Sequence, residues 1–215
     1  RHATIIEDLR RPLFEIQKVT RYELELPCSD HAMVIYYQAQ TDSVTEKVKM
    51  MALNHLINQD YFNELRTTQQ LGYLVGAGYA PFNTRAGMAF YIQSPKFDAK
   101  TLLRRHNSFI NNYLENIDAL DEKNWQQQKH GLSTHIAEKD KNLRLRSQRL
   151  WLAIGNRDHE FHMQQRLLEA LNVLTLKDLK AYALRLFNED RPRYELLSSA
   201  KVNKSQNMPL CSQSL

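Results

Sequence analysis

The sequence predicts an α+β fold: a mostly antiparallel β-sheet with helices packed on one face. The chain has 215 residues, of which 42% are hydrophobic and 25% charged, as is ordinary for one soluble domain with a buried core. Short runs with strand character occur in two pairs, at residues 21–40 and 71–93. Beyond residue 98, apolar side chains recur mostly at helical spacing, and strand pairs followed by packed helices are typical of the α+β class.

The expected strands are rich in β-branched and aromatic residues or alternate polar with apolar residues. They lie at residues 21–26, 32–40, 71–80, 86–93 and 194–198. The alternation in RYELEL indicates a half-buried first strand, and the second strand is expected to run antiparallel to it. Pro81, Phe82, Asn83 and Thr84 predict a hairpin turn between the third and fourth strands.

The expected helices mostly begin at residues that make good N-caps. They lie at about 44–67, 98–116, 121–139, 142–154, 160–170 and 175–187. We therefore expect the element order β-β-α-β-β-α-α-α-α-α-β. Residues 1–19 are interpreted as an irregular lead-in segment, residues 20–198 as the domain, and residues 199–215 as a polar tail.

Charge and cysteine content exclude few classes of protein. The net charge is +5, but 24 acidic residues are interspersed among the 29 basic ones. The densest basic stretch, Lys139 to Arg149, falls on a helical pattern, which favours a solvated face over a nucleic-acid surface. Cys28 and Cys211 have no metal-like spacing, and the sequence neither predicts nor excludes a single disulfide bond between them. The start at Arg1, without a signal-peptide core, indicates an excised piece of a longer chain.

Zinc-peptidase motifs are missing from this sequence. Neither H-E-x-x-H nor H-x-x-E-H occurs, and His55 is followed four residues later by Gln59, a poor zinc ligand. His159 and His162 could share a helix face, but solvation is the expected role of such a pair. The glycines of residues 72–78 do not form a phosphate-binding loop and indicate a close backbone approach or a bulge. The residues alone therefore predict an α+β interaction domain that binds no metal.

One segment adds a specific resemblance. Residues 61–75 read YFNELRTTQQLGYLV, which resembles the F-N-x-L-R-T-x-x-Q-L-G-Y-x-V signature in the C-terminal half of pitrilysin and insulin-degrading enzyme. The neighbouring segments 35–38 (IYYQ) and 90–94 (FYIQS) resemble the strands that flank this signature. The resemblance spans roughly residues 20–198, is strong to residue 95, and is only topological in the helices beyond.

The resemblance implies that the chain is the fourth of four homologous α+β domains of a zinc metalloendopeptidase. Zinc would be bound in the N-terminal half of the same polypeptide, and the two halves would enclose a peptide or small unfolded protein. This chain alone would then bind no zinc and be inactive. The implied partners are that N-terminal half and the peptide substrate, with no nucleic acid and no membrane. The implied compartment is the periplasm in a Gram-negative bacterium and the cytoplasm otherwise.

The resemblance also implies which residues contact the substrate, namely Arg66 and Tyr73. A tyrosine O–H can donate to the oxygen on which charge develops, an arginine can hold the neighbouring carbonyl, and loss of one such donor typically lowers the rate ~10²–10³-fold. The residues expected to support the motif are Asn63, Thr67, Gln70, Leu71 and Gly72.

Structural alternatives stand beside these roles. Arg66 could cap the end of a helix, and Tyr73 could be a half-buried aromatic residue of the sheet. The alternative function is a non-catalytic interaction or assembly domain of the same fold.

Overall fold

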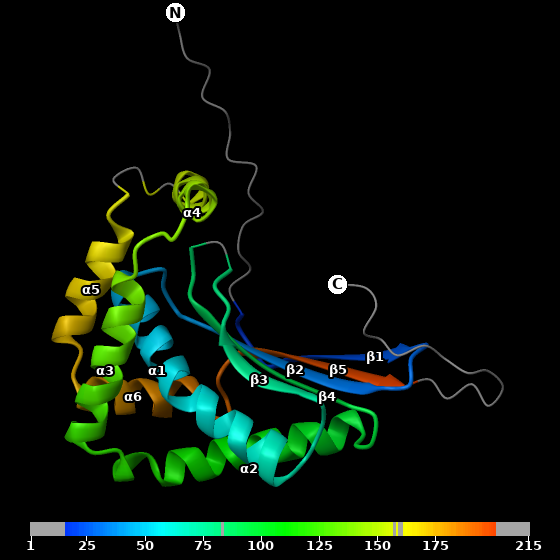
Figure 1. Cartoon of the computed structure of the whole chain (residues 1–215). Helices are drawn as coiled ribbons and strands as arrows, with labels where there is room; N and C mark the ends of the chain where they lie inside the picture. The colour runs from blue at the N-terminus through cyan, green and yellow to red at the C-terminus, as the bar shows by residue number, and fades with distance from the viewer. Residues whose placement is uncertain (1–15, 83, 157, 159–160, 201–215) are drawn as a thin grey trace, which may run out of the picture.

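The computed structural model of the chain describes residues 16–82, 84–156, 158 and 161–200. Within these residues a five-stranded sheet is covered on one face by helices (Figure 1). The elements follow the predicted order, and the predicted α+β class is confirmed. The lead-in segment before residue 16 and the tail after residue 200 lie outside the described residues.

The strands form one mixed sheet in the order β1-β5-β2-β4-β3. Their bounds are Thr20–Leu26 (β1), His31–Gln38 (β2), Leu74–Tyr79 (β3), Gly87–Ser94 (β4) and Arg193–Ala200 (β5). β2 pairs antiparallel with β4 and β5, and β3 pairs antiparallel with β4, whereas β1 pairs parallel with β5. The sheet is therefore mostly antiparallel, as predicted, with one parallel pair at its edge.

The first two strands run in opposite directions, as expected, but they are not neighbours because β5 lies between them. Glu195 of β5 is fully buried and forms ion pairs with Arg21 of β1 (2.7 Å) and with Arg193 of its own strand (2.9 Å). The expected half-buried character of β1 is wrong, since nearly all its side chains are exposed. A two-residue alternation predicts a strand but not its partner, and an edge strand keeps little of its surface buried.

The helices have the bounds Val44–Phe62 (α1), Ala99–Glu115 (α2), Glu122–Ala137 (α3), Leu143–Gly155 (α4), Met163–Val173 (α5) and Leu176–Leu186 (α6). A six-residue π-helix, η1 (Asn63–Thr68), continues α1, and a short 3₁₀-helix, η2 (Ile117–Ala119), follows α2.

Five of the helices begin at a capping side chain that accepts the backbone N–H three residues on. These caps are Ser43, Asp98, Asp121, Asn142 and Thr175. The helix expected from residue 160 begins instead at Met163, and His162, which precedes it, supplies no side-chain cap.

The core lies between the sheet and the helices that cover it. At its centre Tyr61 of α1 packs against Phe90 of β4, with ring centroids 4.9 Å apart, and against Phe109 of α2. His106 is fully buried in this cluster, where its Nδ1 lies 3.1 Å from the Tyr61 hydroxyl. Burial, with a smaller contribution from the positive charge of Arg193, lowers the pKa of His106 to about 3. This histidine is therefore a neutral core residue.

Helix α4 stands away from the sheet (Figure 1, top) and buries none of its residues. The stretch Lys139 to Arg149, which lies on α4 and the turn before it, is largely exposed, as predicted for a solvated face. Part of its charge is paired, because Arg149 binds Asp140 (2.7 Å) and Lys141 binds Glu138 (2.8 Å). In the described part of the chain, no helix combines the length and apolar character needed to span a membrane.

Candidate functional site

Arg66 and Tyr73 line the same open pocket at one end of the sheet. The pocket has a volume of about 650 Å³ and lies where β4 ends and β3 begins. It is lined by residues from η1, from the segment that follows it, and from the turn after β4. These residues are Phe62, Arg66, Thr67, Gln70, Leu71, Gly72, Tyr73, Ser94, Pro95 and Lys96. The structure thus brings together every residue of the predicted set except Asn63.

The end of α1 differs from the expected helix. The α-helical hydrogen bonds stop at Phe62, and η1 continues as a π-helix in which Arg66 occupies the last turn and is half-buried. A π-helix has a wider turn than an α-helix, and short π segments are frequent at functional sites. The direction in which Arg66 leaves the helix is therefore set by η1, which sequence spacing alone did not reveal.

The turn after η1 has two features that hold its shape. Gln70 has a φ of 52°, in the left-handed region, and reverses the chain immediately after the helix. The next residue, Leu71, is buried in the core, and its N–H donates to the Leu65 carbonyl (3.0 Å). These two residues direct the chain back towards the sheet, which agrees with the supporting role expected for them.

Gly72 crosses the backbone of β4 at very short range. A Cβ atom added to Gly72 would lie 2.0 Å from the Gln93 carbonyl oxygen and 2.8 Å from its carbon. No residue with a side chain fits there unless the backbone moves. The expected strand at 71–80 therefore starts only at Leu74, and the chain from Leu71 to Tyr73 runs outside the ladder. Tyr73 precedes the strand and is 45% exposed at its entrance.

The Tyr73 hydroxyl is held by a buried carboxylate that the sequence analysis missed. It donates to Oδ2 of Asp30, a side chain that is only 2% exposed. The same oxygen accepts from Nε2 of Gln93 (3.1 Å), and Oδ1 accepts from the Ser29 hydroxyl (3.0 Å). Asp30 lies in the turn before β2, so its sequence context indicated only turn-forming material. Gln93, by contrast, belongs to the FYIQS segment that the resemblance had marked.

Arg66 supplies positive charge to this pocket. Among the described residues its guanidinium makes no hydrogen bond or ion pair of its own, and Lys96 adds a second cation to the lining. Of the two other expected supporting residues, Asn63 accepts from Gln59 Nε2 (2.9 Å) and binds the Thr68 hydroxyl through its carbonyl (3.3 Å). Thr67 is exposed at the pocket, so the hydroxyl that closes the helix end is that of Thr68.

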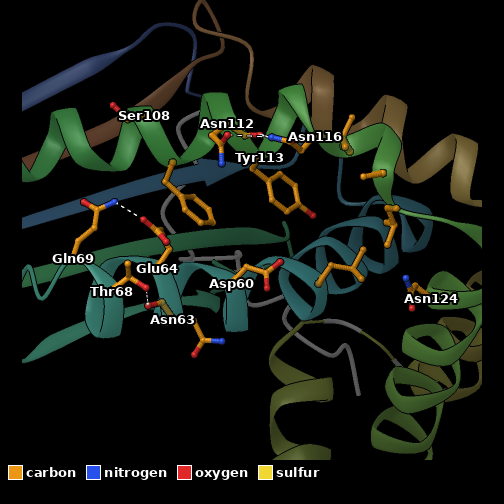
Figure 2. Close-up of a pocket in the computed structure, with 15 residues that line it drawn as sticks. Asp60, Asn63, Glu64, Thr68, Gln69, Ser108, Asn112, Tyr113, Asn116 and Asn124 are labelled. Carbon is orange, nitrogen blue, oxygen red and sulfur yellow. Dashed lines mark hydrogen bonds between the residues drawn. The ribbon is translucent and has the colours of Figure 1, made fainter.

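A second, larger pocket of about 770 Å³ lies on the other side of η1 and was not anticipated (Figure 2). Its walls come from α1, η1, α2, η2 and α3, and seven of its fifteen lining side chains are amides or carboxylates. Gln69 donates to Glu64 (2.8 Å), and Asn116 donates to Asn112 (3.1 Å). Desolvation raises the pKa of Asp60 above its usual range. Arg66 and Tyr73 do not line this pocket, so it is separate from the predicted site.

Metal ligands are not gathered anywhere in the described part of the chain: it holds no group of three histidine, cysteine or acidic residues that could bind an ion. His159 and Cys211 fall outside the described residues. The Cys28 thiol is buried and donates to the backbone carbonyl of Asp30 (3.4 Å), next to the carboxylate that holds Tyr73.

Comparisons with known proteins point to one family of peptidases. Residues 52–151 match the model of the "PQQ synthase PqqF-like, C-terminal lobe domain 4" family. Human insulin-degrading enzyme is 27% identical over 209 residues, which cover 91% of this chain and 20% of the enzyme. A nardilysin-like protein of Arabidopsis thaliana is 28% identical over 167 residues, covering 76% of this chain and 16% of that protein. The crystal structure of pitrilysin superimposes with a TM-score of 0.75 over 90% of this chain, at 20% identity.

The chain is similar to the C-terminal domains of the pitrilysin and insulin-degrading enzyme family. The resemblance stated from residues 61–75 is thereby confirmed. The matched regions span only 16–20% of the length of the two relatives named above, whose names describe whole proteins. The region matched by the family model includes η1, Gly72, Tyr73 and Gln93, so the residues that line the pocket all lie inside the matched region.

Proposed function

We propose that this chain is the C-terminal substrate-binding domain of a zinc metalloendopeptidase and that Arg66 and Tyr73 contact the bound peptide. The observation that carries this proposal is that both side chains line one pocket. Arg66 is available there for a ligand, since its guanidinium has no ion pair among the described residues, and Tyr73 is 45% exposed.

The chemistry of the pocket suits a peptide backbone. Zinc held by the N-terminal half would activate the water that attacks the scissile carbonyl. Arg66 presents a planar set of donors, which can bind one or two peptide carbonyls and stabilise negative charge nearby. Lys96 adds positive potential at the same opening. The developing charge would therefore meet a region with cationic side chains on this half of the enzyme.

The partners in this proposal are the N-terminal half of the same polypeptide and a peptide or small unfolded protein. Selection would depend mainly on the fit of the substrate into the space between the halves. We propose a periplasmic enzyme if the source is a Gram-negative bacterium and a cytoplasmic enzyme otherwise.

The test is steady-state cleavage of a quenched fluorescent peptide by the full-length polypeptide carrying Arg66→Ala or Tyr73→Phe. Loss of one hydrogen-bonding group at a reacting centre typically lowers kcat by ~10²–10³, and we expect kcat/KM to fall by at least tenfold in each variant. Arg105→Ala, at an exposed position on α2, and Tyr36→Phe, at a hydroxyl that binds the Ala80 carbonyl, are matched controls. Near-wild-type kinetics for both Arg66→Ala and Tyr73→Phe would refute the assignment.

The second candidate is a non-catalytic assembly domain. It is favoured by the apolar side chains that α4 exposes, which include Trp151 (74%), Leu143 (78%) and Leu152 (65%). The same experiment separates the two candidates. If the Arg66 and Tyr73 variants keep full activity while Trp151→Ser and Leu152→Ser dissociate the protein from a larger assembly, the domain serves assembly.

A further inference from the structure

The Tyr73 hydroxyl is engaged by a group that lies behind the pocket. Asp30 does not line the pocket and is almost completely buried, yet its Oδ2 accepts the Tyr73 O–H. The same oxygen also accepts from Gln93, and Oδ1 of the carboxylate accepts from Ser29. Gln93 is in turn fixed by the sheet, because it pairs with Ala32 of β2 and Leu74 of β3. The tyrosine oxygen is therefore positioned by a rigid part of the fold.

A buried carboxylate needs such donors. Moving an ionised side chain out of water is unfavourable unless hydrogen bonds replace its hydration. Asp30 obtains three from side chains, those of Ser29, Tyr73 and Gln93. Removal of the Tyr73 hydroxyl would leave Oδ2 of Asp30 with Gln93 as its one side-chain donor. The hydrogen bond between Asp30 and Tyr73 therefore orients the tyrosine and also stabilises the buried carboxylate.

The pairing also determines what Tyr73 can offer to a ligand. A phenol has one O–H, and once that proton is donated the oxygen can only accept. A neighbouring carboxylate makes the same oxygen a better acceptor, because chains of hydrogen bonds polarise one another. The family resemblance implies that the tyrosine donates to a developing oxyanion. For that role, the Tyr73 O–H would first have to break its hydrogen bond to Asp30.

We propose that Asp30 is a positioning residue that accepts a hydrogen bond from the Tyr73 hydroxyl and so orients it, leaving the Tyr73 oxygen to accept a hydrogen bond from a backbone N–H of the bound peptide. This inference rests on the proposed function, because it needs a peptide in the pocket. In this arrangement the two side chains bind different groups of the peptide: Arg66 binds carbonyl oxygens, and Tyr73 binds an amide hydrogen. An extended peptide presents both groups along its backbone.

The first experiment is a double-mutant cycle in the full-length polypeptide, with kcat/KM for a quenched fluorescent peptide as the readout. The variants are Asp30→Asn, Tyr73→Phe and the double variant. Asparagine has nearly the volume of aspartate but lacks its charge. We expect Asp30→Asn to lower kcat/KM by about tenfold in the wild-type background and by less than about twofold in the Tyr73→Phe background. Equal losses in both backgrounds would overturn the inference, because Asp30 would then act independently of Tyr73.

Asp158→Asn is the matched control for neutralising a buried aspartate. Asp158 is 9% exposed, pairs with Arg166, and lies outside the pocket of Arg66 and Tyr73. This variant should lose stability without a change in kcat/KM of the folded protein. A thermal unfolding curve of each variant shows whether it is folded under the assay conditions.

A second experiment leaves Asp30 unchanged and so remains decisive if Asp30→Asn does not fold. A series of substrates carries one ester in place of one amide, at each non-scissile bond near the cleaved one, which removes a single N–H. We expect one ester to lower kcat/KM by about tenfold for the wild-type protein and to have no further effect on Tyr73→Phe. If the difference in kcat/KM between wild type and Tyr73→Phe is as large for every ester substrate as for the all-amide peptide, Tyr73 does not accept a hydrogen bond from the backbone. The inference is then wrong.

The outcomes separate this inference from the proposed function. Wild-type kinetics for Tyr73→Phe would overturn both. A large loss in Tyr73→Phe that neither Asp30→Asn nor any ester substrate reproduces would retain Tyr73 in the proposed function and overturn the role of Asp30.

Discussion

Replacement of Gly72 by alanine tests the geometry on which the pocket depends. The added Cβ would lie 2.0 Å from the Gln93 carbonyl oxygen, whereas ordinary contacts begin at 3.4 Å. Both partners are backbone atoms, so rotation of a side chain cannot relieve the overlap. Gln93 is paired with neighbouring strands on both sides. Overpacking of a tight site usually costs about 1–3 kcal/mol, and we expect Gly72→Ala to lower the free energy of unfolding by about 3 kcal/mol.

Gly78 provides the matched control because it lies in β3, a few residues further on, and a Cβ added to it would meet nothing within 4 Å. Alanine restricts the unfolded chain more than glycine does, so Gly78→Ala should change stability by no more than about 1 kcal/mol, in the stabilising direction. Urea unfolding followed by circular dichroism measures both variants. Equal midpoints for Gly72→Ala and the wild type would show that Gly72 does not approach Gln93 as closely as the structure indicates.

Two further predictions concern the core and the turn. The folded-state pKa of His106, about 3, is below its usual value near 6.5, so its contribution to stability is complete above pH 6.5 and is lost as the pH falls towards 3. The loss should be about 1.4 kcal/mol per pH unit in that window, and His106→Gln should show a correspondingly flatter stability profile in urea unfolding at pH 7, 6 and 5. Gln70→Gly, at a φ of 52°, should raise the unfolding midpoint or leave it unchanged, gaining at most about 1 kcal/mol. Gln69→Gly, at a φ of −85°, should lower it, and a larger loss for Gln70→Gly than for Gln69→Gly would contradict the reasoning.

Local patterns predicted the elements well where a local cause determines them. Helix caps such as Asp98 and Asp121 depend on a side chain and an N–H three residues away, so their sequence is sufficient. The strands at 71–80 and 32–40 were each placed within a few residues, although both were expected to be longer than they are. The partners of β1 could not be predicted, because the Arg21–Glu195 ion pair joins residues from the two ends of the domain.

The candidate site was predicted only in part for a similar reason. Arg66 and Tyr73 came from the resemblance of a contiguous motif, and their common pocket agrees with it. Asp30 lies 43 residues before Tyr73 and belongs to no motif, so no spacing connects the two. The π-helical form of η1 was also missed, since π-helices are rare and a helical pattern predicts an α-helix by default.

The sequence by itself therefore determined the α+β class and the order of the elements, and its resemblance to the family selected Arg66 and Tyr73 as candidate site residues. Those properties follow from periodicity, capping and a contiguous motif, each of which acts over a few residues. Only the tertiary structure decided that β5 separates β1 from β2, that Gly72 crosses Gln93, and that Asp30 holds the Tyr73 hydroxyl. These are contacts between distant segments, and their geometry arises when the whole sheet and its helices pack together.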